Sequence, residues 1–301
     1  MKSGFIAIIG RPNVGKSTLM NALLGTKVSI TSPKPQTTRW QILGIKTLPE
    51  AQLVFIDTPG IHDDNKRAMN RYMNRVASSV ISDADIIVFL VDADNWYEED
   101  ELAIKKLQGT EKPVVLVVNK IDKIPNKGEL LPVFERLNKI IPAELDIDPD
   151  KFHIIPVSAL KKENIDMLEL ELIKLLPEGP LLFPEEQVTD KPIRFQISEI
   201  IREKLIYLTE EEIPYTTTVE IEQLAEGEKL TEISAVIWVE REGQKAIVIG
   251  KGGEKLKKIG TQARRDIERL LGGKKVFLRL WVKVKEHWTD DDRAMRSLGY
   301  D

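Results

Sequence analysis

Short apolar runs alternate with amphipathic segments along the first half of the chain. Each run has the length of a buried strand, and the segments between runs carry apolar residues at helical spacing. This alternation predicts an α/β fold, with a mainly parallel sheet covered by helices on both faces. The expected strands are residues 5–9, 41–47, 52–56, 86–91, 114–118 and 153–155. The expected helices are residues 18–24, 66–81, 98–107 and 129–140.

The pattern changes near residue 177. Residues 177–192 contain four prolines and show no period, which predicts a semi-rigid linker. The elements expected beyond it are a helix over 195–206, strands over 216–224, 231–240 and 275–284, and a basic amphipathic helix before the last strand. We therefore expect a first domain over 1–176 and a smaller α+β domain over 193–301.

Composition is that of an ordinary soluble protein. Of 301 residues, 42% are apolar and 31% charged, and no run approaches the roughly 18 apolar residues of a membrane span, so we expect a cytoplasmic protein. The absence of cysteine excludes disulfides and thiolate chemistry, and three scattered histidines do not indicate a metal site. The net charge of −4 hides an asymmetry, because residues 245–285 hold thirteen Lys or Arg against three acids. Such a local excess is typical of a surface that binds polyanions.

A glycine-rich motif, Gly-Arg-Pro-Asn-Val-Gly-Lys-Ser-Thr, follows the first apolar run. Its glycines free the loop from Cβ clashes, so that backbone N–H groups and the start of the next helix can surround phosphates. Lys16 would supply charge for the outer phosphates, and the Ser17 hydroxyl would bind Mg²⁺. A plain glycine turn is the alternative, but the strand before the loop and the helix after it favour nucleotide binding. The predicted phosphate-binding residues are Gly10, Arg11, Pro12, Asn13, Val14, Gly15, Lys16, Ser17 and Thr18.

A second motif, Asp-Thr-Pro-Gly at residues 57–60, falls where an expected strand ends. The carboxyl ends of parallel strands form the edge at which α/β sheets bind ligands. Asp57 would supply the acid of the Mg²⁺ shell, and Gly60 would let a backbone N–H approach a terminal phosphate. Alone the motif is an ordinary turn, but beside the first motif it predicts a triphosphate site.

Two more strand ends carry residues that suit a base. Residues 119–122 read Asn-Lys-Ile-Asp, and a carboxylate at Asp122 can accept two parallel hydrogen bonds from the adjacent N1–H and N2–H₂ donors of guanine. A buried Asp122 left unpaired by another base would be strongly disfavoured. Asn119 would face the other edge of the base, and the Lys120 stem would lie against its ring. The backbone of Ser158, Ala159 and Leu160 would close the pocket.

Another glycine loop opens the basic stretch. Residues 246–250 read Ala-Ile-Val-Ile-Gly and continue through Lys-Gly-Gly into a basic helix. This pattern resembles the type II K-homology (KH) fold, whose GXXG loop clamps about four nucleotides of a single strand. A helix cap on a solvated basic face is one alternative; a second nucleotide site is a weak one, because no Lys-Ser or Lys-Thr follows. The expected RNA-binding residues are Ile249, Gly250, Lys251, Gly252, Gly253, Lys255, Leu256, Lys257, Lys258 and Arg264.

The ordered motifs of the first domain are similar to those of the translation-factor-related GTPases. The resemblance implies GTP hydrolysis, with a Mg²⁺ ligand in the segment before Arg39, where Thr38 is preferred to Thr37. Ile61 stands where Ras-like GTPases place a water-orienting glutamine, so slow intrinsic hydrolysis is expected, and Asn13 matches a residue that coordinates K⁺ in several such GTPases. The implied metal ligands are Ser17, Thr38 and Asp57, and the implied catalytic residues are Asn13, Lys16, Thr38 and Gly60.

With the KH module added, the whole chain resembles the Era GTPase family. The resemblance implies a monomeric GTP switch that binds the 3′ end of small-subunit ribosomal RNA, assists assembly of the 30S subunit and associates with the inner membrane. Hydrolysis would release the loops at Thr38 and Gly60 and reposition the RNA module through the linker. The alternatives are an ATP-driven RNA-remodelling enzyme, a GTP-gated membrane protein and a passive RNA-binding scaffold. Asp122 argues against the first, and the glycine spacing is not needed for the second.

Overall fold

A computed structural model describes residues 1–60, 68–94, 96–210 and 212–300. These residues form two compact units. The first unit contains residues 1–29, 38–60 and 70–190, and the second contains residues 30–37, 68–69 and 191–300. Two short pieces from the first half of the chain therefore fold with the second half, which no sequence pattern indicated.

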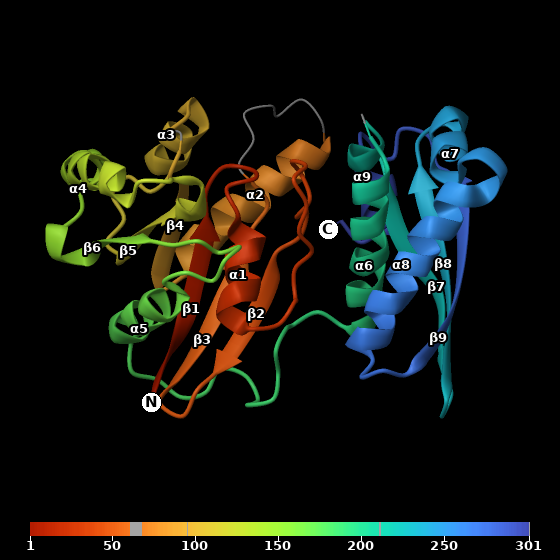
Figure 1. Cartoon of the computed structure of the whole chain (residues 1–301), viewed down its shortest axis with the longest axis horizontal. Helices are drawn as coiled ribbons and strands as arrows, with labels where there is room; N and C mark the ends of the chain where they lie inside the picture. The colour runs from red at the N-terminus through yellow and green to blue at the C-terminus, as the bar shows by residue number, and fades with distance from the viewer. Residues whose placement is uncertain (61–67, 95, 211, 301) are drawn as a thin grey trace. The chain divides into compact units, whose positions relative to one another are not determined.

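The first unit is built on six strands. They are β1 (Lys2–Ile9), β2 (Ile42–Thr47), β3 (Ala51–Asp57), β4 (Ile86–Asp92), β5 (Val114–Asn119) and β6 (Phe152–Pro156). The strand order is β2-β3-β1-β4-β5-β6, and all neighbours run parallel except β2 and β3 (Figure 1). The predicted mainly parallel sheet is confirmed.

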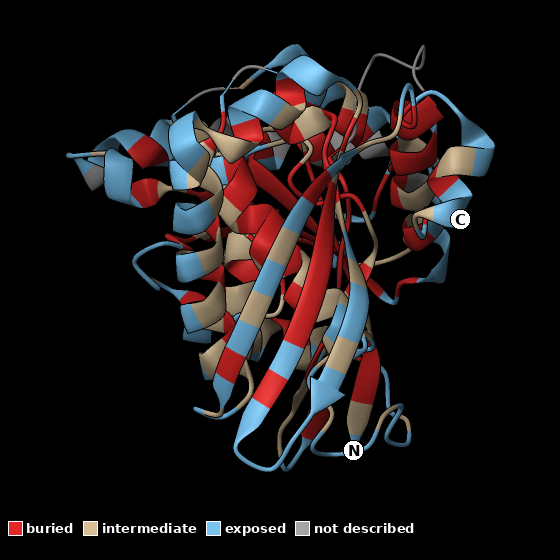
Figure 2. Cartoon of the chain, turned by 90° about the vertical axis from the view of Figure 1, so that its right-hand side faces the viewer, coloured by how far each residue is buried: buried red, intermediate tan, exposed pale blue. Residues whose placement is uncertain are grey.

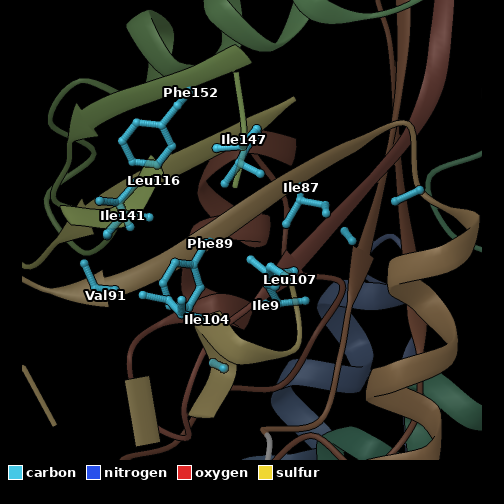
Figure 3. Close-up of a cluster of buried hydrophobic side chains, with 14 of the residues drawn as sticks. Ile9, Ile87, Phe89, Val91, Ile104, Leu107, Leu116, Ile141, Ile147 and Phe152 are labelled. Atoms are coloured by element: carbon cyan, nitrogen blue, oxygen red, sulfur yellow. The ribbon is translucent and has the colours of Figure 1, made fainter. Parts of the chain in front are cut away.

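Helices cover both faces of this sheet. They are α1 (Lys16–Leu24), α2 (Ala68–Asp83), α3 (Glu98–Lys105), α4 (Leu130–Leu145) and α5 (Ile165–Leu175). Side chains of α2, α3 and α4 pack around Phe89 and Leu116 of the central strands (Figure 3), while α1 contacts β1, β3 and α5 on the other face. The loops after β1, β3, β4 and β5 therefore meet at one edge, where open α/β sheets bind ligands.

Residues 177–190, predicted as part of a linker over 177–192, fold on the first unit instead. Ile45 N of edge strand β2 donates to Val188 O at 2.8 Å. The Gln52 side-chain oxygen accepts two further backbone N–H groups of the segment, at 2.8 and 3.0 Å. The apolar residues of this segment have no helical or strand-like spacing, because its backbone hydrogen bonds go to neighbouring strands and side chains rather than into a helix or strand of its own.

The second unit is the predicted smaller α+β module. Its elements are α6 (Ile193–Leu208), β7 (Thr218–Glu226), β8 (Leu230–Val239), α7 (Glu242–Ile249), α8 (Glu254–Leu270), β9 (Lys275–Val284) and α9 (Asp292–Ser297). β8 lies between β7, which is antiparallel to it, and β9, which is parallel. α6 and α8 share a hydrophobic core with the sheet. Exposed positions alternate with buried or half-buried ones along β9, whereas the central strand β8 is buried over most of its length (Figure 2). Helix α7, which precedes the glycine loop, was not predicted.

Short 3₁₀ turns complete the described secondary structure. They lie at Ile121–Lys123, Lys127–Glu129, Pro149–Lys151, Ile213–Tyr215 and Lys251–Gly253. No helix in the described parts of the chain has the length and apolar composition needed to cross a membrane.

Candidate nucleotide and RNA sites

The loop between β1 and α1 has the backbone geometry of an anion cradle. Gly10, Asn13 and Gly15 have positive φ angles of 147°, 60° and 107°, and such turns let successive N–H groups point to one concavity. A Cβ on Gly10 would lie 2.5 Å from the carbonyl oxygen of Leu90, so this position needs glycine for space as well. Lys16 Nζ donates to the carbonyls of the first two loop residues, at 3.0 and 2.9 Å. The lysine is thereby held against the loop.

The charge of Lys16 is poorly compensated. Burial lowers its pKa from 10.5 to about 8, although the negative charge of Asp57 acts in the opposite direction. A phosphate placed against this ammonium group would favour its charged form. The loop is therefore electrostatically suited to an anion.

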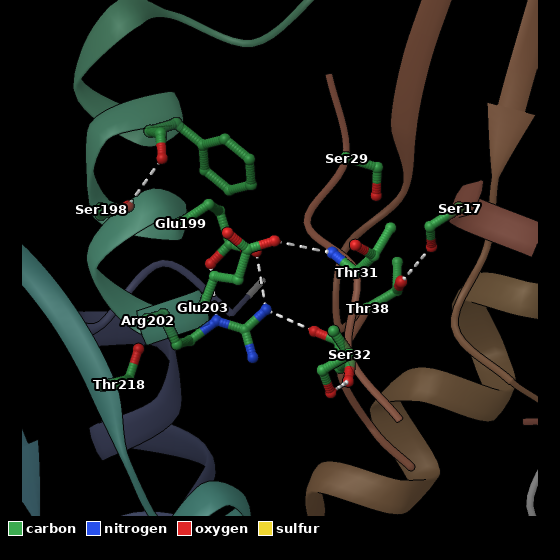
Figure 4. Close-up of polar contacts among 12 residues, drawn as sticks. Ser17, Ser29, Thr31, Ser32, Thr38, Ser198, Glu199, Arg202, Glu203 and Thr218 are labelled. Atoms are coloured by element: carbon green, nitrogen blue, oxygen red, sulfur yellow. Dashed lines mark hydrogen bonds and ion pairs between the residues drawn. The ribbon is translucent and has the colours of Figure 1, made fainter. Parts of the chain in front are cut away.

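Two hydroxyls and one carboxylate meet beside the loop. Ser17 Oγ and Thr38 Oγ1 share a hydrogen bond of 2.9 Å (Figure 4). Asp57 is fully buried at the end of β3 and accepts a hydrogen bond from Ser29 Oγ at 2.8 Å, and burial raises the pKa of its carboxyl group. Its Oδ1 atom has no hydrogen-bond partner among the described residues. A buried carboxylate oxygen without a donor, near two hydroxyls, suits a hard cation such as Mg²⁺.

The hydroxyls of Thr37 and Thr38 have different partners. Thr37 Oγ1 donates to Lys34 O at 2.7 Å and lies 2.6 Å from Ser32 Oγ, so its hydrogen bonds stabilise the turn over residues 32–37. Thr38 Oγ1 lies 2.9 Å from Ser17 Oγ, the other predicted hydroxyl ligand. This contact favours Thr38 over Thr37 as the metal ligand. Within the described residues, no three His, Cys, Asp or Glu side chains gather as a metal site.

Gly60 approaches the same loop closely. A Cβ on Gly60 would lie 3.0 Å from backbone atoms of Pro12, so a side chain would separate the two segments. Asn13 is exposed, and its carbonyl oxygen accepts a hydrogen bond from Lys120 Nζ at 2.9 Å. Ile61, on which the expectation of slow hydrolysis depends, lies outside the described residues.

The side chain of Asn119 connects two of the predicted motifs. Its Nδ2 donates to Val14 O at 2.9 Å, and its Oδ1 accepts from Ala159 N at 3.0 Å. The amide therefore braces the phosphate loop against the last motif, a role that the motif pattern did not predict. Its contact with the edge of a base stays a prediction.

Asp122 stands at the opening of the predicted base pocket. The Ser158 hydroxyl donates to Asp122 Oδ1 and orients the carboxylate. Asp122 is exposed rather than buried, because it follows the end of β5 on a short turn, and Leu160 nearby in the last motif is 73% exposed. The expectation of a buried carboxylate is therefore wrong for this structure, although its orientation leaves it accessible to paired donors.

The second glycine loop lies between α7 and α8. Gly250, Gly252 and Gly253 have φ angles of 74°, 61° and 81°. A Cβ on Gly250 would lie 2.7 Å from the side chain of Lys255, whereas no atom of the described residues lies within 4 Å of a Cβ on the other two. The loop is thus open to a ligand that approaches along its backbone.

A groove of about 390 Å³ begins at this loop. It is lined by Gly253, Leu256, Lys257, Gly260, Thr261, Arg264, Leu278 and Leu280. Four of these residues, Gly253, Leu256, Lys257 and Arg264, were predicted to bind RNA. The predicted Ile249 is not among the lining residues, and both Ile249 and Leu256 pack partly against the core. The lining residues of α8 repeat at three- and four-residue steps along one helical face, a signal that could have identified the missed Gly260 and Thr261.

Comparisons with known proteins match both units. One family model, described as 50S ribosome-binding GTPase, matches residues 5–120, and a second, described as KH domain, matches residues 212–289. GTPase Era of Haemophilus influenzae is 54% identical over 301 residues, covering 99% of this chain and 96% of that protein. GTPase Era of Coxiella burnetii is 51% identical over 298 residues, covering 99% and 98%. The chain belongs to the Era family of GTPases.

Two solved Era structures match the whole chain. One is described as Era in complex with MgGDPNP and nucleotides 1506–1542 of 16S ribosomal RNA, with 43% identity, a TM-score of 0.94 and coverage of 100% of this chain and 99% of that one. The other is a single-residue variant of Aquifex aeolicus Era bound to GDP·AlF4⁻, with 44% identity, a TM-score of 0.92 and the same coverage. The Era match confirms a GTPase domain followed by a KH domain, and the first of these two Era structures contains Mg²⁺ with its nucleotide analogue.

The nucleotide site also contains residues that the motifs did not reveal. Arg11 is held by Asp100, with Nε and Oδ2 3.1 Å apart, and its guanidinium lies 4.5 Å from the centre of the Tyr97 ring. Asp92 Oδ2 accepts from Lys120 Nζ at 2.7 Å. Burial raises the pKa of Asp92, but the Lys120 hydrogen bond and charge act against it, and the net pKa is lowered. Asp92 could have been found because it ends a strand at the ligand edge, whereas nothing local marks Asp100.

Proposed function

We propose that this Era-family GTPase binds the 3′ end of small-subunit ribosomal RNA through the groove of α8 and assists assembly of the 30S subunit. The observation that carries the proposal is the groove itself. It joins an open glycine loop to Lys257 and Arg264, which can bind phosphates, and to Leu256 and Leu280, against which bases can pack. A solved Era relative holds nucleotides 1506–1542 of 16S ribosomal RNA, which supports the choice of RNA.

Crosslinking in cells with sequencing of the bound RNA tests this proposal. We expect reads from wild-type protein to concentrate at the 3′ end of the small-subunit RNA. Replacing Lys251 and Gly252 together by Asp should remove that peak, because two negative charges then face the RNA backbone. Replacing exposed Lys229 and Lys275 by Asp changes the charge at least as much outside the groove and should leave the peak in place. Equal loss in both variants would contradict a specific groove.

Residues 10–18 bind the triphosphate in this proposal. Lys16 and the loop N–H groups contact the phosphates, while Ser17, Thr38 and Asp57 hold the metal ion. When bound, Mg²⁺ would neutralise phosphate charge and fix the geometry of the phosphates. Asp57 Oδ1 has no hydrogen-bond partner among the residues that the structure describes, which supports this assignment. Replacing Asp57 by Asn should weaken GTP binding in Mg²⁺ far more than in EDTA, which a nucleotide titration in both buffers measures.

Guanine is selected by Asp122, with Asn119, Lys120 and the 158–160 backbone forming the rest of the pocket. The support is the position of these residues at one end of the sheet and the orientation of Asp122 by Ser158. An adenine-binding, ATP-driven enzyme is disfavoured because adenine lacks the paired donors. Competition of ATP, GTP and XTP for the bound nucleotide distinguishes these substrates.

Hydrolysis proceeds slowly by itself and is assisted by K⁺ at Asn13. The exposure of Asn13 and the fixed position of its carbonyl group beside the phosphate loop support this role. Lys16 and Gly60 stabilise the charge that develops on the terminal phosphate. GTP turnover should be faster in KCl than in NaCl, and the difference should disappear on replacing Asn13 by Ala. Equal rates of the wild type in the two salts would remove K⁺ from the proposal.

The nucleotide state controls RNA binding in this scheme. RNA affinity should differ between GDP and a non-hydrolysable GTP analogue, and identical affinities would contradict the switch. A passive RNA-binding scaffold is the main alternative. Stimulation of GTP turnover by ribosomal RNA would exclude it, since a scaffold has no reason to couple the two sites.

The family resemblance further suggests a monomer with peripheral contact to the inner membrane. The basic face of α8 supports contact with anionic lipid headgroups as well as with RNA. Sedimentation with vesicles that contain anionic lipid, with and without single-stranded RNA, tests whether lipid and RNA bind the same face of α8. Competition between them would indicate a shared face. Light scattering after size-exclusion chromatography measures the oligomeric state.

A further inference from the structure

Residues 30–37, which connect α1 to β2, belong to the second unit and are bound to α6. Glu203 Oε1 accepts a hydrogen bond from Thr31 N at 3.1 Å. Arg202 Nη2 donates to the carbonyl oxygen of Thr37 at the other end of the segment (Figure 4). The segment is therefore held at both ends by two consecutive residues of one helix.

Arg202, which binds the Thr37 carbonyl, forms a buried ion pair with Glu199. Arg202 and Glu199 are 0% and 4% exposed, and the guanidinium donates to both Glu199 carboxylate oxygens, through Nε and Nη2, each at 2.6 Å. Apolar side chains of similar volume would often pack at such a place without loss of stability. The charged pair has a different effect: the Arg202 guanidinium, fixed by its two bonds to Glu199, determines where the Thr37 carbonyl lies.

The segment itself is a closed turn. Ser32 Oγ accepts from Lys34 N at 3.1 Å and lies 2.6 Å from Thr37 Oγ1. Gln36 has a left-handed φ of 58°. Because these bonds tie the turn to itself, fixing its last carbonyl fixes the planar peptide group that continues into Thr38. The next side chain, that of Thr38, is the one that bonds to Ser17 Oγ at 2.9 Å.

We propose that Arg202, held by Glu199, is a positioning residue for GTP hydrolysis. It fixes the Thr37 carbonyl and thereby directs the Thr38 hydroxyl toward Ser17. The inference rests on the proposed role of Thr38 as metal ligand.

A double-mutant cycle in the full-length protein tests the inference. Replacing Arg202 by Met should lower kcat for GTP about tenfold or more, because small misplacements of catalytic groups reduce rates strongly. GDP affinity should change less than twofold, since the GDP-binding groups do not include Thr38. In a Thr38→Ala background, Arg202→Met should cause no further loss of kcat, because the residue through which it acts is already absent.

Controls separate positioning from folding. Arg202→Lys keeps one donor and should restore part of the rate. Arg194→Met removes an arginine from the same helix that donates to backbone carbonyls of Ile221 and Glu222, and it should leave kcat within twofold. A Mg²⁺ titration should show that Arg202→Met needs more Mg²⁺ for half-maximal turnover, an effect that a general loss of stability would not produce.

Four results would overturn the inference. Equal losses of kcat from Arg202→Met in the wild-type and Thr38→Ala backgrounds would show that the residues act independently. A parallel loss of GDP affinity would show a structural role. If Thr38→Ala lowers turnover while Arg202→Met does not, the role of Arg202 is contradicted but the proposed metal site stands. Normal turnover in Thr38→Ala would contradict both.

Discussion

The two glycine loops of this chain look alike in sequence and differ in surroundings. Both turn through three residues with positive φ and lead into a helix. In the phosphate loop, a Cβ on Gly10 would clash with Leu90 and a Cβ on Gly15 would clash with Asn119. In the KH loop, no atom of the described residues lies within 4 Å of a Cβ on Gly252. The first loop is enclosed by neighbouring strands and suits a compact ligand, whereas the second is open and suits a long one. Glycine is thus needed for space as well as backbone conformation at Gly10, Gly15 and Gly250, and for backbone conformation alone at Gly252 and Gly253.

Glycine-to-alanine substitution is the sharpest way to test this difference. Gly10→Ala should reduce stability by about 3 kcal/mol and abolish GDP binding, because both its φ and its contact with Leu90 exclude a side chain. Gly252→Ala should lower stability by only about 1 kcal/mol, the effect of a left-handed φ in open space. Urea unfolding of both variants measures the effect, and equal losses would remove the distinction.

The second-largest effect is expected at the base pocket. Asp122→Asn should weaken GTP binding about 100-fold. The charged carboxylate is replaced by an amide whose NH₂ group would face the N1–H and N2–H₂ donors of guanine. XTP, which presents a carbonyl instead of the amino group, should bind the variant better than GTP does. RNA binding through the groove should be unaffected, so filter binding of RNA is the matched control. Unchanged GTP selectivity would place base recognition elsewhere.

A pH effect should distinguish the enclosed loop further. Burial lowers the pKa of Lys16 to about 8, and we expect nucleotide phosphates to bind its charged form. GDP affinity should therefore be constant below pH 8 and fall above it, with a slope approaching about tenfold per pH unit. Fluorescence titration between pH 7 and pH 9.5 measures this slope, which should vanish in Lys16→Met, although binding there is weaker throughout. A slope that persists in Lys16→Met would assign the titration to another group.

The smallest expected effect is in the open groove. Lys257→Gln should weaken RNA binding by a few-fold at low salt, because one of several phosphate contacts is lost. The slope of log affinity against log salt should decrease by about 0.7, as expected for one contact to a single strand. Lys229→Gln, outside the groove, is the control. An unchanged salt slope for Lys257→Gln would mean that this side chain does not bind phosphate.

The sequence predicted the parts of both sites that depend on local pattern. Glycine spacing, strand ends and the basic helix identified both loops because each requires particular residues at adjacent positions. Asp100 and Arg202 were missed because their roles come from partners distant in the chain, 89 residues away at Arg11 and 165 at Thr37. Asn119 was assigned to the base, but its amide braces two loops, which only the tertiary structure shows.

The boundaries of the units were also beyond local pattern. Prolines and missing periodicity over 177–192 predicted a linker, since a stretch without regular structure has the same composition whether or not it is bound to a neighbour. The attachment of residues 30–37 to α6 depends on buried charges of α6 that follow the same helical spacing as core residues. No pattern within either segment carries that information.

Residues 177–190 have a consequence for the behaviour of the isolated protein. An edge strand such as β2 normally offers a row of unpaired N–H and C=O groups, onto which another chain can add by strand pairing. Here Val188 accepts the N–H of Ile45, and Thr189 forms a bridge with Gly44. The same residues that carry the chain out of the first unit thus protect it against edge-to-edge aggregation, and a truncated protein that ends at residue 176 would lose this protection.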